Sequence, residues 1–347
     1  MPLPELNERE RQVLAAVIRS YVETAEPLGS RTLSRRFGLG VSPATIRNTM
    51  SDLEDKGFLF HPHTSAGRVP TEKASRVYVD ELIQLHPLPG AERQRLATEI
   101  MAGGSTIESI LRRAAQSLGV LTQELGVALG PRLDATILEK LEIVRLTSEK
   151  LILVLSLRGG LMRTIFIEVP GELADHAVAQ VQLVLNERLG GLSLLTIRQS
   201  LGSRLRDATG TSGTTELLNI FVQEGEQLFD LPSVPESDSL VLGQASLLAD
   251  KPEFASGEQM RRIIELTETR DELATLLRGR SASAGVQITI GSEHGASLPG
   301  GLTVVTAEYR AGSVAGVIGV IGPTRMPYDK VIALVSHTSS LVTELLA

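Results

Sequence analysis

Residues 28–50 read LGSRTLSRRFGLGVSPATIRNTM, and this stretch contains clear signals for two helices and the turn between them. A short helix is predicted from Ser30 to Gly38, because its apolar residues fall four apart on one face. Ser42 is a good N-cap and Pro43 suits the first helical position, so a longer helix is predicted to begin there. Two helices joined by a tight glycine-containing turn are typical of a helix-turn-helix.

The longer helix is predicted to end at Gly57, which suits the left-handed conformation that stops helices. At 100° per residue, Ile46, Met50 and Leu53 form its buried stripe. The opposite face is then polar and consists of Ala44, Thr45, Asn48 and Ser51, with Arg47 at its edge. Asparagine can pair with adenine and arginine with guanine in the major groove, so this face is of the type that reads bases.

The flanking residues complete a larger pattern. A preceding helix is predicted after Asn7, which forms a capping box with Glu10. After Gly57, the run FLFHPHTSAGRVP (58–70) indicates a β-hairpin that carries His61, His63 and Arg68. Helix, short helix, turn, longer helix and hairpin is the order of a winged helix-turn-helix.

Charge along the chain supports a nucleic-acid partner. The chain has 347 residues and a formal net charge of -7, which by itself argues against DNA. Residues 1–80 hold 11 basic and 10 acidic residues, about +1, and leave -8 for residues 81–347. Residues 28–50 contain four arginines and no acid, so the acidic chain has a local patch of +4. Such a patch can neutralise DNA phosphates.

The rest of the chain predicts an α+β fold with a sheet and flanking helices. An amphipathic helical pattern begins near Ile107 and lasts to Gly130. Strands are predicted within 141–169, with a hairpin turn at Gly159-Gly160, and at 285–290, 302–310 and 313–322. Helices are predicted at about 172–189 and 328–346. Residues 200–256 are less regular, so we interpret them as an insertion into the sheet domain, with a separate third domain as the competing interpretation.

Several chemistries find no support in the sequence. The chain has no cysteine, which excludes disulfides, thiolate metal sites and a cysteine nucleophile. It has no G-x-S-x-G, H-E-x-x-H or Walker A motif, so we expect neither an enzyme nor a cofactor. His61 and His63 lack a third ligand, and a wing that contacts phosphate is the favoured interpretation over a metal site. No signal peptide or long apolar run is present, so a cytoplasmic protein without a membrane segment is expected.

Three stretches resemble a known family. Residues 28–82, 243–254 (GQASLLADKPEF) and 316–335 (GVIGVIGPTRMPYDKVIALV) resemble the bacterial heat-inducible transcription repressors of the HrcA family. The resemblance implies three domains: a winged-helix DNA-binding domain with a linker helix at 1–88, a GAF-like domain at 89–199 and 257–347, and an inserted dimerisation domain at 200–256. It also implies a homodimer on an inverted-repeat operator (CIRCE) upstream of chaperone operons such as groESL and dnaK, inactivation by heat, and assistance from the chaperonin GroEL.

Within this interpretation, Thr45, Arg47 and Asn48 are assigned to base or near-base contacts. Contacts with the DNA backbone that position the domain are assigned to Arg31, Arg35, Arg36, Ser42, His61, His63 and Arg68. Ser30 is also predicted to be a DNA-binding residue. Two alternatives stay open. One is a winged-helix regulator that senses a metabolite through its GAF-like domain, and the other is a chaperone-interacting scaffold without a DNA role.

Overall fold

The chain folds into two compact units of mixed helix and sheet, as the α+β prediction requires. The computed structural model describes residues 5–63, 67–102, 107–131, 136–158, 161–169, 171, 173–206, 212–228, 239–281, 285–295, 298, 300–312 and 314–346. Unit 1 comprises Met1–Leu129, Leu240–Glu308 and Val317–Val342, and unit 2 comprises Gly130–Ser239, Tyr309–Gly316 and Thr343–Ala347. Among the described residues, no helix is both long and apolar enough to cross a bilayer.

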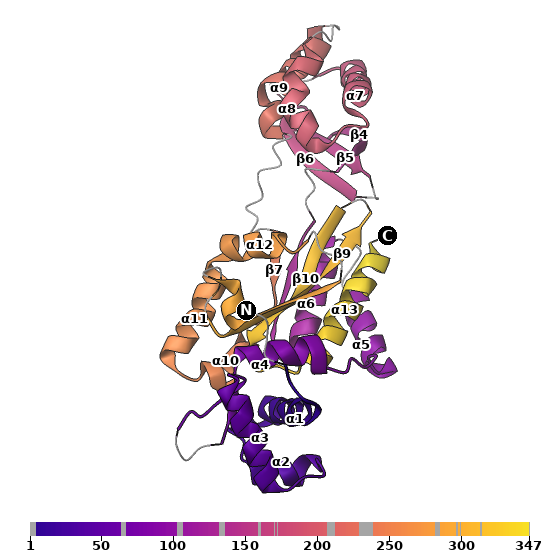
Figure 1. Ribbon diagram of the computed structural model, residues 1–347. Coiled ribbons are helices and arrows are strands. Elements are labelled where there is room, and N and C mark those ends of the chain that lie inside the picture. Colours follow the sequence, from indigo (N-terminus) through magenta and orange to yellow (C-terminus); the bar gives the residue numbers. More distant parts are fainter. Residues whose placement is uncertain are drawn as a thin grey trace. The chain divides into compact units, whose positions relative to one another are not determined.

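The N-terminal module, residues 5–82 of unit 1, contains the predicted elements in the predicted order (Figure 1). Their bounds are α1 Glu8–Thr24, α2 Ser30–Phe37, α3 Pro43–Asp55, β1 Leu59–Phe60, β2 Val69–Pro70 and α4 Glu72–Val77, continued by a π-helical turn at Tyr78–Leu82. The capping box before α1 is confirmed, because Asn7 and Glu10 each accept a hydrogen bond from the other's amide at 2.9 Å. The three helices contact one another and bury Val13, Leu14, Val17, Leu33, Ile46, Met50 and Leu53.

The rest of unit 1 is the sheet domain, a five-stranded sheet with helices on both faces. The strand order is β7-β3-β10-β9-β8, with bounds β3 Leu125–Leu129, β7 Leu240–Leu242, β8 Val286–Ile290, β9 Leu302–Ala311 and β10 Val314–Pro323. The helices are α5 Gly90–Met101, α6 Ile107–Thr122, α10 Ser246–Ala249, α11 Gly257–Glu268, α12 Arg270–Arg278 and α13 Tyr328–Leu345.

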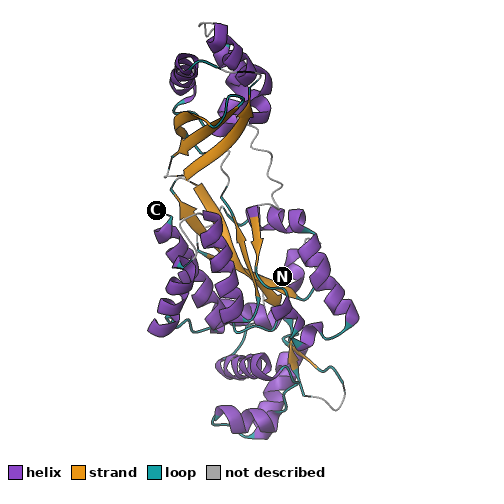
Figure 2. Cartoon of the chain, turned by 180° about the vertical axis from the view of Figure 1, so that it is seen from behind, coloured by secondary structure: helices purple, strands orange, loops and turns teal. Residues whose placement is uncertain are grey.

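Helices cover both faces of the large sheet (Figures 1 and 2), and alternate residues of β3 face different helices. Leu125 and Val127 of β3 pack in one buried cluster with Ile263 of α11 and Leu277 of α12. Gly126 faces α6, because a Cβ there would lie 1.8 Å from the carbonyl oxygen of Ala115. The inner strands β3 and β10 are therefore buried on both faces, and they are apolar or glycine at nearly every position.

Unit 2 contains a second, smaller sheet. β4 Leu138–Arg145, β5 Lys150–Leu157 and β6 Leu161–Glu168 pair antiparallel in chain order. The helices are α7 Asp175–Leu189, α8 Leu194–Leu205 and α9 Ser212–Leu228. The side chain of Asn186 on α7 pairs with both the amide and the carbonyl of Leu141 at 2.8 and 2.7 Å, which satisfies backbone groups of strand β4.

Helix α6 is shorter than the sequence pattern predicts. The amphipathic pattern was expected to continue to Gly130, but the helix ends at Thr122, and Gln123 adopts a left-handed φ of 59°. Residues Leu125–Leu129 then form β3, an inner strand of the large sheet between β7 and β10, and every residue of it is buried. A strand that is buried on both faces has no alternation, so its residues could not be distinguished from a continuing apolar helix face.

The insertion also differs from its predicted bounds of 200–256. The strands within 141–169 belong to unit 2 and form their own sheet, whereas residues 240–256 belong to unit 1. Strand β7 belongs to the large sheet, where it pairs with β3 through Val127 and Leu242. The three strands at 138–168 are present as predicted, and the expected turn at Gly159-Gly160 lies outside the described residues. The sequence pattern locates strands but does not show which sheet each one joins.

Candidate nucleic-acid interface

Helix α3 presents its polar face to solvent because the opposite face is fully used in packing. Ile46, Met50 and Leu53 are all 1% exposed or less, as predicted from the helical spacing. Ser42 caps the helix and accepts a hydrogen bond from the Thr45 amide at 3.1 Å. This cap fixes the start of α3 and thereby fixes which side chains point outward.

The predicted base-reading residues lie together on this outward face. Arg47 and Asn48 are exposed, and Thr45 is half-buried. The Thr45 hydroxyl lies 2.9 Å from the hydroxyl of Ser42, so both hydroxyls are held at the first turn of the helix. The first turn of a recognition helix is the part that reaches base edges in helix-turn-helix complexes.

Three of the four clustered arginines form no ion pair with any acidic side chain that the structure describes. Arg31 and Arg35 on α2 and Arg47 on α3 are exposed, and no acidic side chain of the described residues forms an ion pair with any of them. Arg36 differs, because it forms an ion pair with Glu23 of α1 and donates to the Ser20 hydroxyl at 3.1 Å. The free positive charge of the predicted patch is therefore carried by three arginines, and Arg36 ties α2 to α1.

The turn between α2 and α3 depends on two glycines. Gly38 and Gly40 have φ values of 54° and 69°, in the left-handed region that other residues rarely adopt. Ser30 is half-buried at the first position of α2. The two helices are thus joined by the tight glycine-containing turn that the sequence predicts.

The two-stranded ribbon is held against α3 by one carboxylate. Glu54 accepts from His61 Nδ1 at 2.5 Å and from Arg68 at 3.0–3.1 Å. Burial pushes the Glu54 pKa up, but the hydrogen bonds from His61 and Arg68 outweigh it and keep the pKa below its ordinary value. The Arg68 backbone also pairs with Leu28 through two hydrogen bonds of 3.0 Å. The ribbon is therefore fixed to the helix bundle at both side chain and backbone.

These contacts change what two of the predicted residues are free to do. The Arg68 side chain is only 12% exposed and forms an ion pair with Glu54. It therefore stabilises the ribbon, and it would have to leave Glu54 to contact a DNA phosphate. His61 is engaged by the same carboxylate, while His63 is exposed. Glu54 itself was not singled out from the sequence, because its partners His61 and Arg68 lie in the ribbon and no local spacing indicates the pairing.

Several glycines of the sheet domain lie at close-packed positions or in a tight turn. A Cβ on Gly319 would lie 2.1 Å from the carbonyl oxygen of Val305, and one on Gly322 would lie 2.1 Å from Glu124 Oε2. Gly312 has a φ of 58° in the turn between β9 and β10. These glycines permit close strand packing and a tight turn.

Sequence comparisons cover almost the whole chain. The profile described as "HrcA protein C terminal domain" matches residues 108–332. The heat-inducible transcription repressor HrcA of Chlorobium luteolum is 38% identical over an alignment 355 residues long, which covers 99% of this chain and 98% of that relative. The chain belongs to the HrcA family. It is accordingly a heat-inducible transcription repressor, as the resemblance of its motifs implies.

A second HrcA relative and one solved structure are also similar to nearly the whole chain. The HrcA repressor of Geobacter sulfurreducens is 36% identical over 354 residues, 99% of each chain. The crystal structure of a hypothetical protein at 2.2 Å resolution aligns over 99% of each chain with a TM-score of 0.64 and 20% identity. That structure has a similar fold, and its likeness supports the fold alone.

Proposed function

We propose that the N-terminal module is a winged-helix domain that binds operator DNA through the exposed face of α3. The observation that carries this proposal is the pairing of an outward Asn48 and Arg47 with two further arginines, Arg31 and Arg35, that have no acidic partner among the described residues. Exposed arginines beside a helix that offers asparagine supply both phosphate affinity and base readout.

The sheet domain is proposed to be the GAF-like domain and unit 2 the dimerisation domain. The open face of the unit 2 sheet supports the second assignment. Its apolar residues are Val144, Ile152, Val154, Met162 and Phe166, of which Met162 is 72% and Phe166 68% exposed, and they lie beside the polar residues Glu142, Ser156 and Thr164. Exposed apolar residues that adjoin across strands are typical of a surface that another chain covers.

A symmetric dimer would place two copies of α3 on one inverted repeat. We propose that this repeat is the CIRCE element upstream of chaperone operons such as groESL and dnaK, and that binding there blocks transcription in the cytoplasm, at the nucleoid. Heat would remove the DNA-binding state, because folded domains have small margins of stability. The chaperonin GroEL is the proposed assistant of folding.

The proposal is tested by titrating the full chain with a duplex of the inverted repeat that precedes the chaperone operon on its own chromosome. Asn48→Ala should weaken binding by about 1–3 kcal/mol per half-site and leave binding to a scrambled duplex unchanged. Arg35→Ala should weaken binding to both duplexes. It should also make the slope of log affinity against log salt less steep, by about 0.9 per subunit.

The matched control is Arg93→Ala, which removes an exposed arginine of α5 outside the N-terminal module. It should bind both duplexes as the unmodified chain does. If Asn48→Ala leaves both the affinity and the preference for the inverted repeat unchanged, α3 does not read the operator and the proposed interface is wrong.

A further inference from the structure

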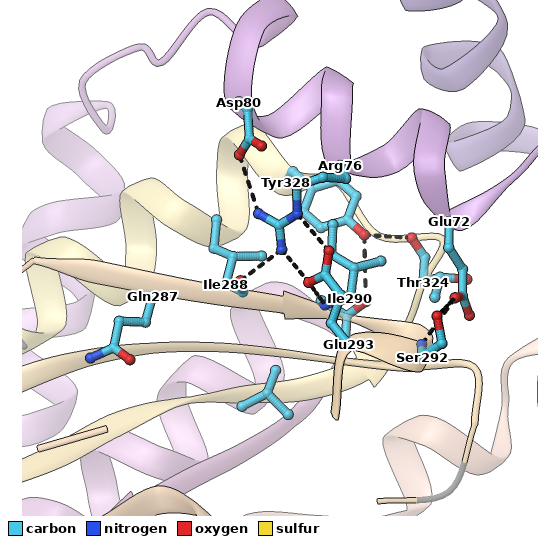
Figure 3. Close-up of polar contacts among 12 residues, drawn as sticks. Glu72, Arg76, Asp80, Gln287, Ile288, Ile290, Ser292, Glu293, Thr324 and Tyr328 are labelled. Atoms are coloured by element: carbon cyan, nitrogen blue, oxygen red, sulfur yellow. Dashed lines mark hydrogen bonds and ion pairs between the residues drawn. The ribbon is translucent and has the colours of Figure 1, made fainter. Parts of the chain in front are cut away.

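The N-terminal module is fastened to the sheet domain by an arginine fork. Arg76 of α4 donates through Nε to Glu293 Oε1 at 2.8 Å and through Nη2 to the other carboxylate oxygen (Figure 3). The same Nη2 donates to the carbonyl oxygen of Ile288 on β8 at 2.8 Å. On its own helix, Asp80 accepts from Nη1 at 3.2 Å. One side chain thus links α4 to both a strand and the 3₁₀ turn Gly291–His294 that follows it.

A second contact on the same helix meets the same turn. Glu72 Oε2 accepts from the Ser292 amide at 2.9 Å and from its hydroxyl at 2.7 Å. Gly291 allows this approach, because its φ is 52° and a Cβ there would lie 1.9 Å from Glu72 Oε1. Glu72 and Arg76 are one helical turn apart, so they fix α4 against the sheet domain along its length.

A third contact, from a different part of the sheet domain, holds α1. Arg325, which follows β10, donates through Nη1 to the carbonyl oxygen of Val22 at 2.6 Å. Its side chain is only 13% exposed and is oriented by an ion pair with Glu253. A single contact would leave the N-terminal module free to rotate, whereas contacts at α1 and α4 define one orientation.

Both partners of the fork are charged at neutral pH. The hydrogen bond to Glu293 raises the pKa of Arg76. Burial pushes the Glu293 pKa up, but hydrogen bonds from Arg76 and from the Ile290 amide outweigh this and keep it below its ordinary value. A two-point guanidinium–carboxylate pair is directional, so its geometry transmits orientation as well as attraction.

The position of the fork connects it to the DNA-binding surface. Strand β2 of the ribbon ends at Pro70, and α4 begins two residues later at Glu72. Partly exposed ion pairs usually contribute little to folding stability. A fork that also binds a backbone carbonyl of the sheet domain is better suited to fixing the orientation of the N-terminal module than to adding folding stability.

We propose that Arg76 and Glu293 form a joint that sets the orientation of the N-terminal module on the sheet domain, and hence the spacing of half-sites that the repressor accepts. Arg76 is then a positioning residue that touches no DNA. This inference rests on the proposed function, because it needs a dimer on an inverted repeat. Half-sites in such operators are read at fixed separations of about 10 base pairs or multiples of that turn.

The joint is tested with four duplexes: the full inverted repeat, a half-site whose other half is scrambled, and two repeats whose spacers are lengthened by about five and about ten base pairs. The full-length chain should prefer the original spacing. Arg76→Ala should keep its half-site affinity but lose roughly tenfold of its preference for the full repeat, since linked sites gain about 10²–10⁴ only when geometry allows both to engage. The affinity of Arg76→Ala for the repeats should also vary less with spacer length than that of the unmodified chain.

Two further variants keep the test valid if Arg76→Ala folds poorly. Glu293→Gln removes the charge of the acceptor, and Arg76→Lys keeps the positive charge but cannot form the fork, so Arg76→Lys should give an intermediate preference. The control is Arg95→Ala, which breaks an exposed ion pair with Glu99 within α5. Arg95→Ala should keep both the preference and the spacer dependence.

The outcomes separate the two proposals. If the unmodified chain binds none of the inverted repeats, the proposed function fails. If the unmodified chain discriminates between spacings and Arg76→Ala, Glu293→Gln and Arg76→Lys discriminate equally well, the proposed function stands and the joint is rejected. A gain of full-repeat affinity in these variants would also reject it, because the fork would then oppose operator binding.

Discussion

At the scale of single residues, two glutamates, Glu54 and Glu124, have structural effects that their positions in the sequence do not indicate. Glu54 binds His61 and Arg68 and so fixes the ribbon to α3. The sequence predicted the outward face of α3 correctly, because Ile46, Met50 and Leu53 are spaced as a buried stripe. It did not predict the partners of Glu54, because an ion pair between a helix and a hairpin depends on a fold that local spacing does not specify.

The second glutamate is Glu124, which is fully buried beside the sheet domain's central strand. Its Oε1 accepts from Lys251, and its Oε2 has no hydrogen-bond partner among the described residues. Burial raises the pKa of Glu124 to about 7, against the lowering effect of Lys251. The folded chain therefore holds this proton more tightly than the unfolded chain, whose Glu pKa is 4.5.

This difference predicts a pH dependence of stability with a defined sign. Between about pH 4.5 and pH 7 the folded state binds more protons at this site, so the contribution of Glu124 to the free energy of unfolding falls as pH rises. Buried His294, whose pKa is lowered, acts in the opposite direction below pH 6.5. Thermal unfolding of the unmodified chain and of Glu124→Gln should be compared across this range. As pH rises, the unmodified chain should lose stability relative to Glu124→Gln. If the difference in free energy of unfolding between the two chains does not change with pH, the raised pKa of Glu124 is wrong.

At the scale of elements, caps and periodicity predicted most helices and strands, and burial on both faces explains the main failure. The starts of α1 and α3 followed from Asn7 and Ser42, whose side chains make the expected hydrogen bonds. The boundary between α6 and β3 did not, because Leu125–Leu129 is apolar at every position except Gly126. A stretch without alternation carries no information on whether it forms a strand or a buried helix.

The pairing of β9 and β10 should be sensitive to a single methyl group. A Cβ on Gly319 would lie 2.1 Å from the Val305 carbonyl oxygen and 2.8 Å from the Thr306 Cα, both backbone atoms. Gly319→Ala should therefore lower the free energy of unfolding by about 1–3 kcal/mol or more, as overpacking does. Chemical denaturation measures this effect. Gly257→Ala is the control, because no heavy atom lies within 4 Å of its Cβ, and a loss of similar size there would contradict the packing argument.

At the scale of the whole molecule, charge is unevenly distributed along a chain whose total charge is acidic. Residues 1–80 carry about +1 and the remainder -8. Arg31, Arg35 and Arg47, which form no ion pair among the described residues, lie on α2 and α3. Which strands belong to which unit could not be read from the sequence, because β4–β6 and β8–β10 have similar apolar content. Assignment to a sheet depends on contacts between segments far apart in the chain.

The open face of the unit 2 sheet gives a prediction at this scale. Phe166→Asp places a charge among Val144, Ile152 and Met162 and should convert the proposed dimer to a monomer. Light scattering after size-exclusion chromatography measures the mass directly. Leu183→Asp on α7 is the control, because Leu183 is 71% exposed but lies off this face, so that variant should stay dimeric. A dimeric Phe166→Asp protein would assign the interface elsewhere.

Strands β3 and β7 are hydrogen-bonded neighbours, yet about a hundred residues of unit 2 separate them in the chain. The chain leaves after Leu129 and returns at Leu240, and the Gly130 amide donates to the Ser239 carbonyl oxygen at 2.9 Å. A short hairpin turn could span the same two strand ends. In evolutionary terms, a lineage could gain, lose or exchange unit 2 without rethreading the sheet. If unit 2 is the proposed dimerisation domain, such an exchange would alter how copies of the repressor associate and would leave the proposed operator-reading helix α3 unchanged.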